Sequence, residues 1–445
     1  MYENDYPKVI VVSHNPFSEN QNNGKTLLNF FKGWPKENIS QLHFSMENPS
    51  YLVCENYYRI LDLEILKKYF RQQNKVGSIT GKNEDVNNKK TKLNNSSIYT
   101  FIKKIFQNNF PSALLFRDFL WNKDYWKTSE LVEWIDNQNP DLVFYQSSNC
   151  PFSFKIVKWI CEERNIPLIM QTTDDYVTAH FSIDPFYWIH HFKIKKQYKW
   201  AVGYSNYVIA IGDLMEKEYK NRFGGSYKVA MNSVTIPDSS DFHNSSNSGK
   251  IKFLFAGNLG LNRWKVIVKI AEALKVLETE GIYAELEIYS LAVPPKNILD
   301  KMNLSPNIGF RGSLNQEELD RKVKNSDVLI HVEAFDRKNR NITRLSISTK
   351  IPEYMRSNRC IFAVGPNDVA SMQYIEKNNL GVVLNTLDKS HLKSNTKELI
   401  NNSELRRKYA ENAMTMVKER HSIGHTNEMI RKIVSESVNS KGIEV

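Results

Sequence analysis

Short apolar runs alternate with longer helical patterns along most of this 445-residue chain. Most of the apolar runs are continuous, which is typical of parallel strands that are buried on both faces. The predicted strands are residues 8–13, 141–145, 167–170, 207–211, 251–256, 284–289, 328–332, 360–364 and 381–384. The helices predicted between them include residues 25–31, 152–164, 214–223, 264–278, 316–325 and 405–420. This alternation predicts doubly wound α/β domains.

The length of the chain predicts two domains. A polar stretch rich in Ser and Asn at residues 236–250 predicts a linker. We therefore expect one Rossmann-like domain over residues 1–235, completed by a helix at about 424–445, and a second over 251–423. Residues 72–97 are rich in Asn, Lys and Gly and predict a mobile loop without a regular element.

The composition narrows the class of protein. Hydrophobic residues make up 41% of the chain and charged residues 24%, as in a soluble globular protein. No apolar run approaches the ~20 residues of a membrane-spanning helix, and the first residues are too acidic for a secretory leader. The four cysteines lack the spacing of a metal or redox motif and predict reduced thiols in a cytoplasmic protein.

Basic residues exceed acidic ones by 60 to 49, which gives a net charge of +11. Such a surplus suits an anionic partner, whether a nucleotide phosphate, a membrane surface or a nucleic acid. The lysines are dispersed and no nucleic-acid-binding motif is present, so a nucleic acid is the least favoured of the three. Residues 186–200 mix aromatic and basic side chains, which suits either a membrane interface or a helix that buries its aromatics.

Doubly wound domains bind ligands at the carboxyl ends of their strands, so the loops that follow strands are the places to search. The first such loop contains Asn23 and Gly24 and precedes a helix that we expect to begin near Lys25. Its Gly-Lys-Thr sequence is not a P-loop, because Glu19 stands where that motif needs a glycine. Gly24 would instead permit close backbone approach to a ligand.

Two adjacent carboxylates, Asp174 and Asp175, follow the predicted strand at residues 167–170. They are placed to accept a proton or to hold a hydroxyl-rich ligand. The alternative is that one of them caps a turn.

The second domain opens on a strand, then Gly257, Asn258 and Gly260, then Arg263 and Lys265 at the start of a helix. Glycines let phosphates approach the backbone, and the two cations would neutralise a diphosphate. The third glycine of a dinucleotide fingerprint is missing, which makes an NAD site a weak prediction. A charged helix start over a tight turn is the alternative.

Two further segments of the second domain carry candidate ligand-binding residues. Glu333 follows the predicted strand at residues 328–332 and is a candidate for ligand contact, whereas His331 within that strand is expected to face the core. The polar residues Ser348, Thr349 and Lys350 precede a short predicted helix that carries Glu353 in its first turn.

Free amides at the start of that short helix would favour an anion, and the Glu353 carboxylate would take two hydroxyls of a sugar. Together they predict a nucleotide-sugar site. The alternative is a surface helix with an ordinary glutamate.

These loops together resemble those of the family 4 glycosyltransferases of GT-B fold, and in particular bacterial enzymes of surface-polysaccharide assembly (capsule, O-antigen or exopolysaccharide). The segments that carry the resemblance are residues 207–215, 255–260 with Arg263, 327–329 and 348–355. The chain departs from the family at Ser346: many members carry a second glutamate seven residues before the one that matches Glu353, and this departure leaves open which residue recognises the sugar hydroxyls.

The resemblance implies two Rossmann-like doubly wound domains that face each other across a cleft. It also implies retaining transfer of a sugar, without a metal or other cofactor. Glu353 would hold the nucleotide ribose, and Arg263 with Lys265 would hold the diphosphate. Asp174 and Asp175 would lie near the transferred sugar, as would the loop with Gly24.

The implied partners are a UDP- or GDP-sugar donor and a saccharide or polyprenyl-diphosphate-linked saccharide acceptor. Docking on an anionic membrane surface would accompany a lipid-linked acceptor, and no nucleic acid is expected. Two alternatives stay open. One is a nucleotide-sugar epimerase of the same fold, and the other is a non-catalytic basic binding protein.

Overall fold

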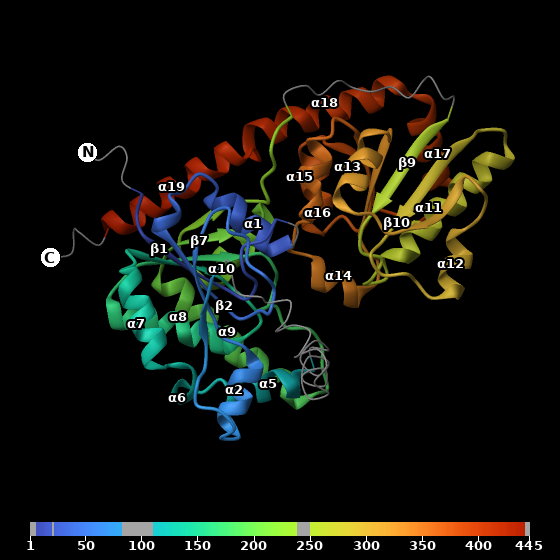
Figure 1. Cartoon of the computed structure of the whole chain (residues 1–445). Helices are drawn as coiled ribbons and strands as arrows, with labels where there is room; N and C mark the ends of the chain where they lie inside the picture. Colours follow the sequence, from blue (N-terminus) through green and yellow to red (C-terminus); the bar gives the residue numbers. More distant parts are fainter. Residues whose placement is uncertain (1–5, 20–21, 82–109, 238–249, 441–445) are drawn as a thin grey trace. The chain divides into compact units, whose positions relative to one another are not determined.

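The computed structural model describes residues 6–19, 22–81, 110–237 and 250–440 (Figure 1). The chain forms two compact units, one of residues 1–230 with 423–445 and the other of residues 231–422. Of the predicted linker, residues 236, 237 and 250 are described and belong to the second unit, and the rest lies outside the described residues.

The first unit is built on one mixed sheet with the strand order β4-β3-β2-β1-β5-β6-β7-β8 in the described part of the chain. All neighbouring strands are parallel except β3 and β4. The strands are β1 (Val9–Ser13), β2 (Ile39–His43), β3 (Asn56–Arg59), β4 (Ser78–Thr80), β5 (Leu142–Gln146), β6 (Leu168–Thr172), β7 (Ser205–Ala210) and β8 (Tyr227–Val229). The strand order reverses between β1 and β5, which is where such sheets bind ligands.

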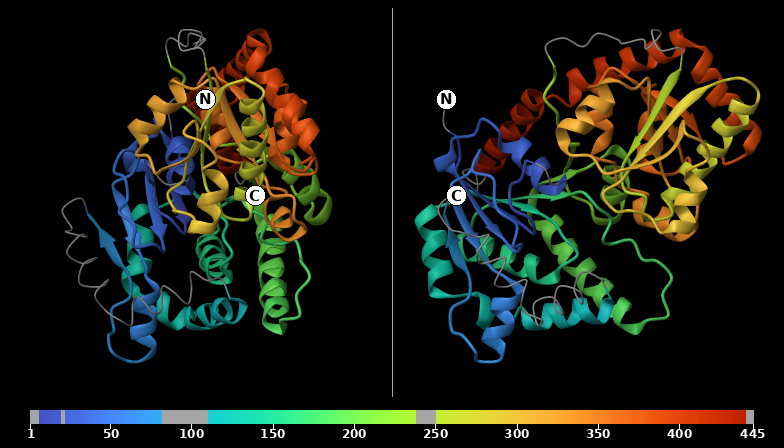
Figure 2. Two further views of the ribbon diagram at one scale, coloured as in Figure 1. Left: turned by 90° about the vertical axis from the view of Figure 1, so that its right-hand side faces the viewer. Right: turned by 45° about the vertical axis from the view of Figure 1, so that its right-hand side comes forward.

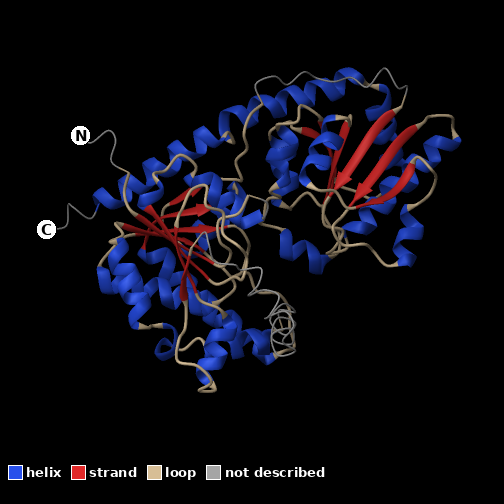
Figure 3. Ribbon diagram, in the orientation of Figure 1, coloured by secondary structure: helices blue, strands red, loops and turns tan. Residues whose placement is uncertain are grey.

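Helices cover this sheet (Figure 3). They are α1 (Asn22–Phe31), α2 (Asp62–Tyr69), α5 (Pro111–Leu120), α6 (Lys123–Trp126), α7 (Ser129–Gln138), α8 (Pro151–Arg164), α9 (Pro185–Tyr204), α10 (Asp213–Phe223) and α19 (Ile423–Asn439), with a 3-10 turn at Lys36–Asn38. The final helix α19 packs beside α1, and its Ile430 and Ile433 join Val9 and Val11 of β1 in the core. The end of the chain therefore contributes to the first unit.

The second unit has a parallel sheet with the strand order β11-β10-β9-β12-β13-β14 (Figure 2). Its strands are β9 (Ile251–Ala256), β10 (Ala284–Tyr289), β11 (Ile308–Gly312), β12 (Val328–Val332), β13 (Cys360–Val364) and β14 (Gly381–Leu384). Its helices are α11 (Arg263–Thr279), α12 (Lys296–Met302), α13 (Gln316–Lys324), α14 (Arg337–Thr343), α15 (Lys350–Met355), α16 (Ala370–Lys377), α17 (Lys389–Asn401) and α18 (Ser403–Arg420).

Strand β4 corrects the expectation that residues 72–97 lack a regular element. It pairs antiparallel with β3, with Thr80 opposite Tyr57, and Thr80 is buried. Backbone pairing with the edge of a sheet does not require an apolar sequence, which explains why composition alone missed this strand. Residues 82–97 lie outside the described residues.

Candidate functional site

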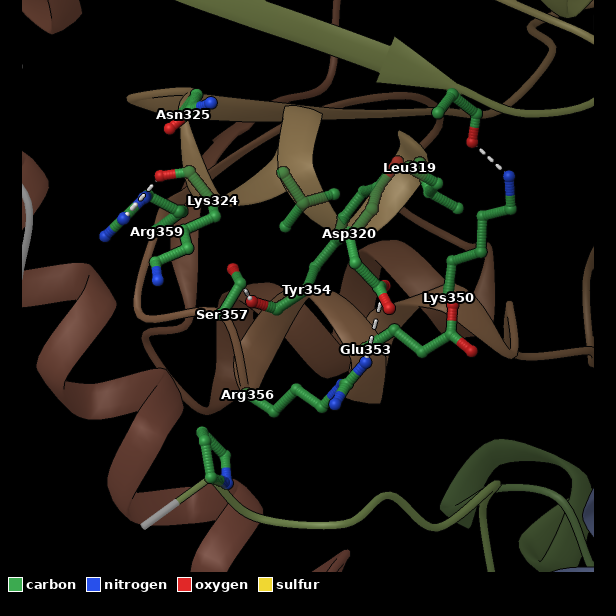
Figure 4. Close-up of a pocket in the computed structure, with 13 residues that line it drawn as sticks. Leu319, Asp320, Lys324, Asn325, Lys350, Glu353, Tyr354, Arg356, Ser357 and Arg359 are labelled. Atoms are coloured by element: carbon green, nitrogen blue, oxygen red, sulfur yellow. Dashed lines mark hydrogen bonds and ion pairs between the residues drawn. The ribbon is translucent and has the colours of Figure 1, made fainter. Parts of the chain in front are cut away.

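A pocket of about 500 Å³ lies in the second unit, between helices α13 and α15 (Figure 4). Glu353 and Lys350 line it from α15, Asp320 lines it from α13, and Ala256 lines it from the end of β9. The pocket therefore reaches the carboxyl end of β9, which is the edge where a doubly wound sheet binds its ligand.

Lys350 connects the start of α15 to this sheet edge. Its ammonium group donates a hydrogen bond to the main-chain carbonyl of Ala256. Burial lowers the pKa of Lys350 below its usual value of 10.5, the Glu353 carboxylate opposes that shift, and the Arg263 cation adds to it. Lys350 and Glu353 therefore both line the pocket, whereas Arg263 is not among its lining residues and acts on Lys350 through its charge.

Arg263 is held in place by a buried carboxylate. Its Nε and Nη2 donate to Oε2 of Glu333 at 3.3 and 3.0 Å, and Glu333 is only 2% exposed. Burial raises the pKa of Glu333, but hydrogen bonding and charge from His331 and Arg263 outweigh it and leave the pKa lowered. Glu333 therefore fixes the orientation of the Arg263 side chain.

His331 fits its expected place in the core. It is 7% exposed, and its Nε2 lies 3.5 Å from Oε1 of Glu333. The histidine therefore supports the buried glutamate.

The loop between β9 and α11 leaves room beside the lysine. A Cβ added at Gly257 would lie 3.0 Å from the Phe255 ring and 3.5 Å from Nζ of Lys350. The Asn258 side chain accepts a hydrogen bond from the amide of Gly260 at 2.7 Å and so shapes the turn. Gly257 thus keeps the approach to Lys350 open.

Lys265 is separate from this group. Its side chain is exposed, and its ammonium lies 5.7 Å from the centre of the Trp264 ring. It also lowers the pKa of Asp336, although hydrogen bonds from Asn262 and Asn339 contribute more to that shift. Of the two predicted diphosphate cations, Arg263 is the one whose charge acts on Lys350.

Several amides at the start of α15 are already paired, which corrects the expectation that free helix amides favour an anion there. The amide of Ser348 donates to Oγ of Ser371 at 3.2 Å, and the amide of Lys350 donates to Oγ of Ser348 at 3.4 Å. The carbonyl of Thr349 accepts from the Asn232 side chain at 3.2 Å. Because α15 has only six residues, its dipole is also small.

In the first unit, Asp175 shapes a turn. Its Oδ1 accepts hydrogen bonds from the amides of Val177 and Thr178 at 3.1 and 2.9 Å and from the Tyr219 hydroxyl at 2.7 Å. Asp174 accepts from the Tyr176 hydroxyl at 3.2 Å. These contacts match the turn-capping alternative for this pair.

The expectation for Gly24 is wrong in one respect. Helix α1 begins at Asn22, so Asn23 and Gly24 lie in the helix and not in the loop before it. A Cβ at Gly24 would lie 2.4 Å from the carbonyl oxygen of Pro16 and 2.8 Å from Cβ of Ser18. The close backbone approach at Gly24 is therefore to the chain's own loop.

The pocket wall contains a charged pair that was not predicted from the sequence. Nη2 of Arg356 lies 3.7 Å from Oδ1 of Asp320 (Figure 4). Arg356 follows Glu353 by three positions, and a helical spacing of three places side chains on one face. That spacing is the signal that could have identified Arg356, whereas Asp320 comes from another helix and no local motif marks it.

No family model and no curated protein matches the sequence. Solved structures resemble nearly the whole chain. Anabaena Alr3699/HepE in complex with UDP and glucose gives a TM-score of 0.60 at 13% identity, covering 97% of this chain and 100% of that one. Sucrose-phosphate synthase from Thermosynechococcus elongatus gives 0.60 at 9% identity, covering 97% and 99%. The α,α-trehalose-phosphate synthase (UDP-forming) from Burkholderia vietnamiensis gives 0.59 at 9% identity, covering 98% and 99%.

The chain has the GT-B fold. This confirms the fold class predicted from the sequence. At these identities the likeness concerns the architecture. Across the described ranges, no helix combines the length and the apolar character that crossing a membrane requires.

Proposed function

We propose that this protein is a retaining glycosyltransferase that moves a sugar from a nucleotide-sugar donor to a saccharide or lipid-linked saccharide. The observation that carries the proposal is the pocket at the carboxyl end of β9, which Lys350 and Glu353 line and where the charge of Arg263 also acts on Lys350. Two cations and a carboxylate there complement a diphosphate and a ribose. Solved structures of the same fold contain UDP and UDP-glucose, so a UDP-sugar is the first donor to test.

The proposed roles follow from the chemistry of each group. The Glu353 carboxylate accepts hydrogen bonds from ribose hydroxyls. Arg263, which Glu333 holds by two hydrogen bonds, presents its guanidinium to the diphosphate, and Lys350 adds a second positive charge. These cations stabilise the charge that develops on the leaving diphosphate.

In the retaining reaction, the acceptor hydroxyl attacks the anomeric carbon on the face from which the diphosphate leaves. The bond from the sugar to the diphosphate breaks, the new glycosidic bond forms, and the hydroxyl proton passes to the departing phosphate oxygen. Positioning and charge stabilisation are the protein's contribution. No residue in this scheme forms a covalent intermediate, and no metal or cofactor is required.

The biological setting that we propose is bacterial surface-polysaccharide assembly, as in family 4. The acceptor is then a saccharide, free or linked to polyprenyl diphosphate. Exposed apolar side chains on α9 support contact with a membrane, because Phe186, Ile189 and Phe192 are 48%, 48% and 64% exposed. Three exposed lysines of the same helix, Lys195, Lys196 and Lys199, suit an anionic surface.

The direct test is to incubate the purified protein with UDP-sugars and GDP-sugars, with and without a panel of saccharide acceptors. We expect release of free nucleotide only when an acceptor is present, together with a product whose new linkage keeps the anomeric configuration of the donor. Conversion of the donor sugar without an acceptor would instead identify an epimerase. Absence of nucleotide binding by calorimetry would overturn the donor site itself.

A further inference from the structure

Three basic side chains stand at the carboxyl ends of neighbouring strands in the first unit. Arg59 ends β3 and His43 ends β2, and the two are paired in the sheet register. His14 directly follows β1, and its carbonyl accepts a hydrogen bond from the amide of Phe44 at 3.1 Å, beside the end of β2. Paired residues of parallel strands point to the same face of the sheet, so His43 and Arg59 share a face.

Arg59 is a buried cation without a compensating anion. It is 4% exposed, and within the described ranges no carboxylate pairs with it and its Nε has no hydrogen-bond partner. Buried charges in folded proteins are normally paired, because an unpaired one is costly. We therefore expect an anion outside the described contacts of Arg59 to neutralise its charge.

Arg117 of the same unit is also a buried arginine, but it has a carboxylate partner. It is 7% exposed, and its Nε donates to Oδ1 of Asp62 at 2.8 Å. Burial lowers the pKa of Arg117, but the charges of Asp62 and Cys150 and the hydrogen bond to Asp62 together outweigh burial and raise it. The same Asp62 oxygen also accepts from Trp121 at 2.7 Å, so this carboxylate is committed to Arg117 and Trp121.

The two histidines add donors. Burial, and then the charge of Arg59, lower the pKa of His43 to about 3, and burial and then the charge of Arg117 lower that of His14 to about 4. Each imidazole is therefore neutral near pH 7 and has one N–H to donate. In the parts of the chain that the structure describes, both ring nitrogens of His43 and Nδ1 of His14 are buried without a partner.

We propose that Arg59, with His43 and His14, binds an oxyanion, a phosphate or carboxylate group carried by the acceptor. A guanidinium presents a planar fork that matches both groups, and a neutral imidazole N–H can donate beside it. The bound oxyanion neutralises the charge of Arg59 and accepts hydrogen bonds from the unpaired N–H groups of Arg59 and the histidines. This inference rests on the proposed function for the acceptor, and it narrows the acceptor class to anionic saccharides or phosphate-bearing saccharides.

The test measures oxyanion binding separately from the donor site. Calorimetric titrations use inorganic phosphate, a sugar 1-phosphate, glucuronic acid and neutral glucose as probes. Because phosphate can also enter the proposed donor site, all proteins carry Arg263→Gln. The compared variants add Arg59→Gln or, as a matched control, Arg222→Gln, which removes a surface arginine of the same unit that pairs with Glu218.

We expect Arg59→Gln to weaken binding of an anionic probe by roughly tenfold or more, and Arg222→Gln to change it less than twofold. Glucose should bind none of the proteins through this site. Preference for the sugar phosphate or glucuronic acid over inorganic phosphate would support an acceptor group. Preference for inorganic phosphate alone, or equal binding with and without Arg59, would overturn the inference.

Stability provides a second readout. Arg59→Gln removes an uncompensated buried charge, so in the Arg263→Gln background its Tm without ligand should equal or exceed that of the protein with Arg59, and the anionic probe should raise only the Tm of the protein with Arg59. If Arg59→Gln fails to fold, Arg59→Lys keeps the charge without the fork and should still show weakened binding. In proteins that keep Arg263, UDP should bind Arg59→Gln as it binds wild type. Oxyanion binding without UDP binding would support this site and contradict the proposed donor function.

Discussion

Lys350 donates a hydrogen bond to the main-chain carbonyl of Ala256 and so joins the start of α15 to the carboxyl end of β9. A nucleotide diphosphate at this edge would compete with the carbonyl for the ammonium group. The proposed donor role therefore requires Lys350 to exchange its contact with the Ala256 carbonyl for a contact with the ligand.

This position leads to a pH prediction. The pKa of Lys350 is lowered in the absence of ligand, and a bound diphosphate would raise it, so binding takes up a proton as the pH rises through the lowered pKa. Nucleotide affinity should therefore fall with rising pH before the usual lysine pKa of 10.5 is reached. Lys350→Arg, which stays charged, should lose most of this pH dependence in calorimetric titrations. Equal pH dependence in both proteins would contradict the role of Lys350.

Glu353→Gln should weaken nucleotide binding and leave the fold intact. Losing a charge-assisted hydrogen bond costs about 1.5–3 kcal/mol, which corresponds to roughly 10- to 150-fold in the dissociation constant. The matched control is Glu376→Gln, which changes an exposed glutamate on α16 of the same unit. An unchanged dissociation constant for Glu353→Gln, measured by calorimetry, would remove Glu353 from the donor site.

Arg263→Ala should reduce turnover more than Lys265→Ala. Glu333 holds the guanidinium of Arg263 by an ion pair, whereas Lys265 is exposed over Trp264. Arg263→Ala also leaves the buried Glu333 without its arginine partner, so Tm should fall in that variant alone. Steady-state kinetics and thermal melts separate the two effects. Equal kinetics for both variants would mean that the diphosphate binds elsewhere.

Asp175→Asn should lower Tm, because the charged acceptor for the amides of Val177 and Thr178 and the Tyr219 hydroxyl becomes neutral. If Asp175 also lies near the transferred sugar, turnover should fall further than nucleotide affinity. Tyr219→Phe removes one of the three hydrogen bonds without changing the carboxylate and is the matched control. Equal losses of turnover in both variants would assign Asp175 to the turn alone.

The sequence predicted the second unit better than the first, for a physical reason. The strands of the second unit include continuous apolar runs such as Cys360–Val364, which match the predicted bounds. Strands β2 and β3 were missed because ISQLH and NYYR carry polar residues. These residues are nonetheless mostly buried, because β2 and β3 lie inside the sheet, with other strands on both sides.

Some residues of the candidate site could also be predicted from the sequence, and others could not. Glu353 and Arg263 stand in local motifs, so the sequence marks them. The pairing of Asp320 with Arg356 joins two helices, and the alignment of His43 with Arg59 depends on strand register. Neither relationship can be predicted from the sequence alone, because each depends on how separate elements pack in the folded chain. The role of Glu333 as the buried hydrogen-bond acceptor for Arg263 likewise depends on the fold, because no sequence motif shows that Glu333 is buried.

The last prediction concerns the membrane. Replacing Lys195, Lys196 and Lys199 by Gln should reduce sedimentation with anionic vesicles, because each lysine near such a surface contributes about 1 kcal/mol. Lys193 is left unchanged, since its ammonium lies 3.0 Å from the buried Asp118 and its loss would disturb the fold. The effect should be larger at low salt than at high salt, because salt screens exposed charges.

The control replaces three exposed lysines of the same unit that lie outside α9, namely Lys32, Lys217 and Lys220. This change removes the same net charge, so a general loss of basicity would affect both triple variants equally. Phe192→Ser should reduce binding further, including at high salt, because insertion of an exposed aromatic ring is not screened. If the wild-type protein stays in the supernatant even at low salt, the exposed face of α9 has no membrane role and the acceptor is not presented at a membrane by this route.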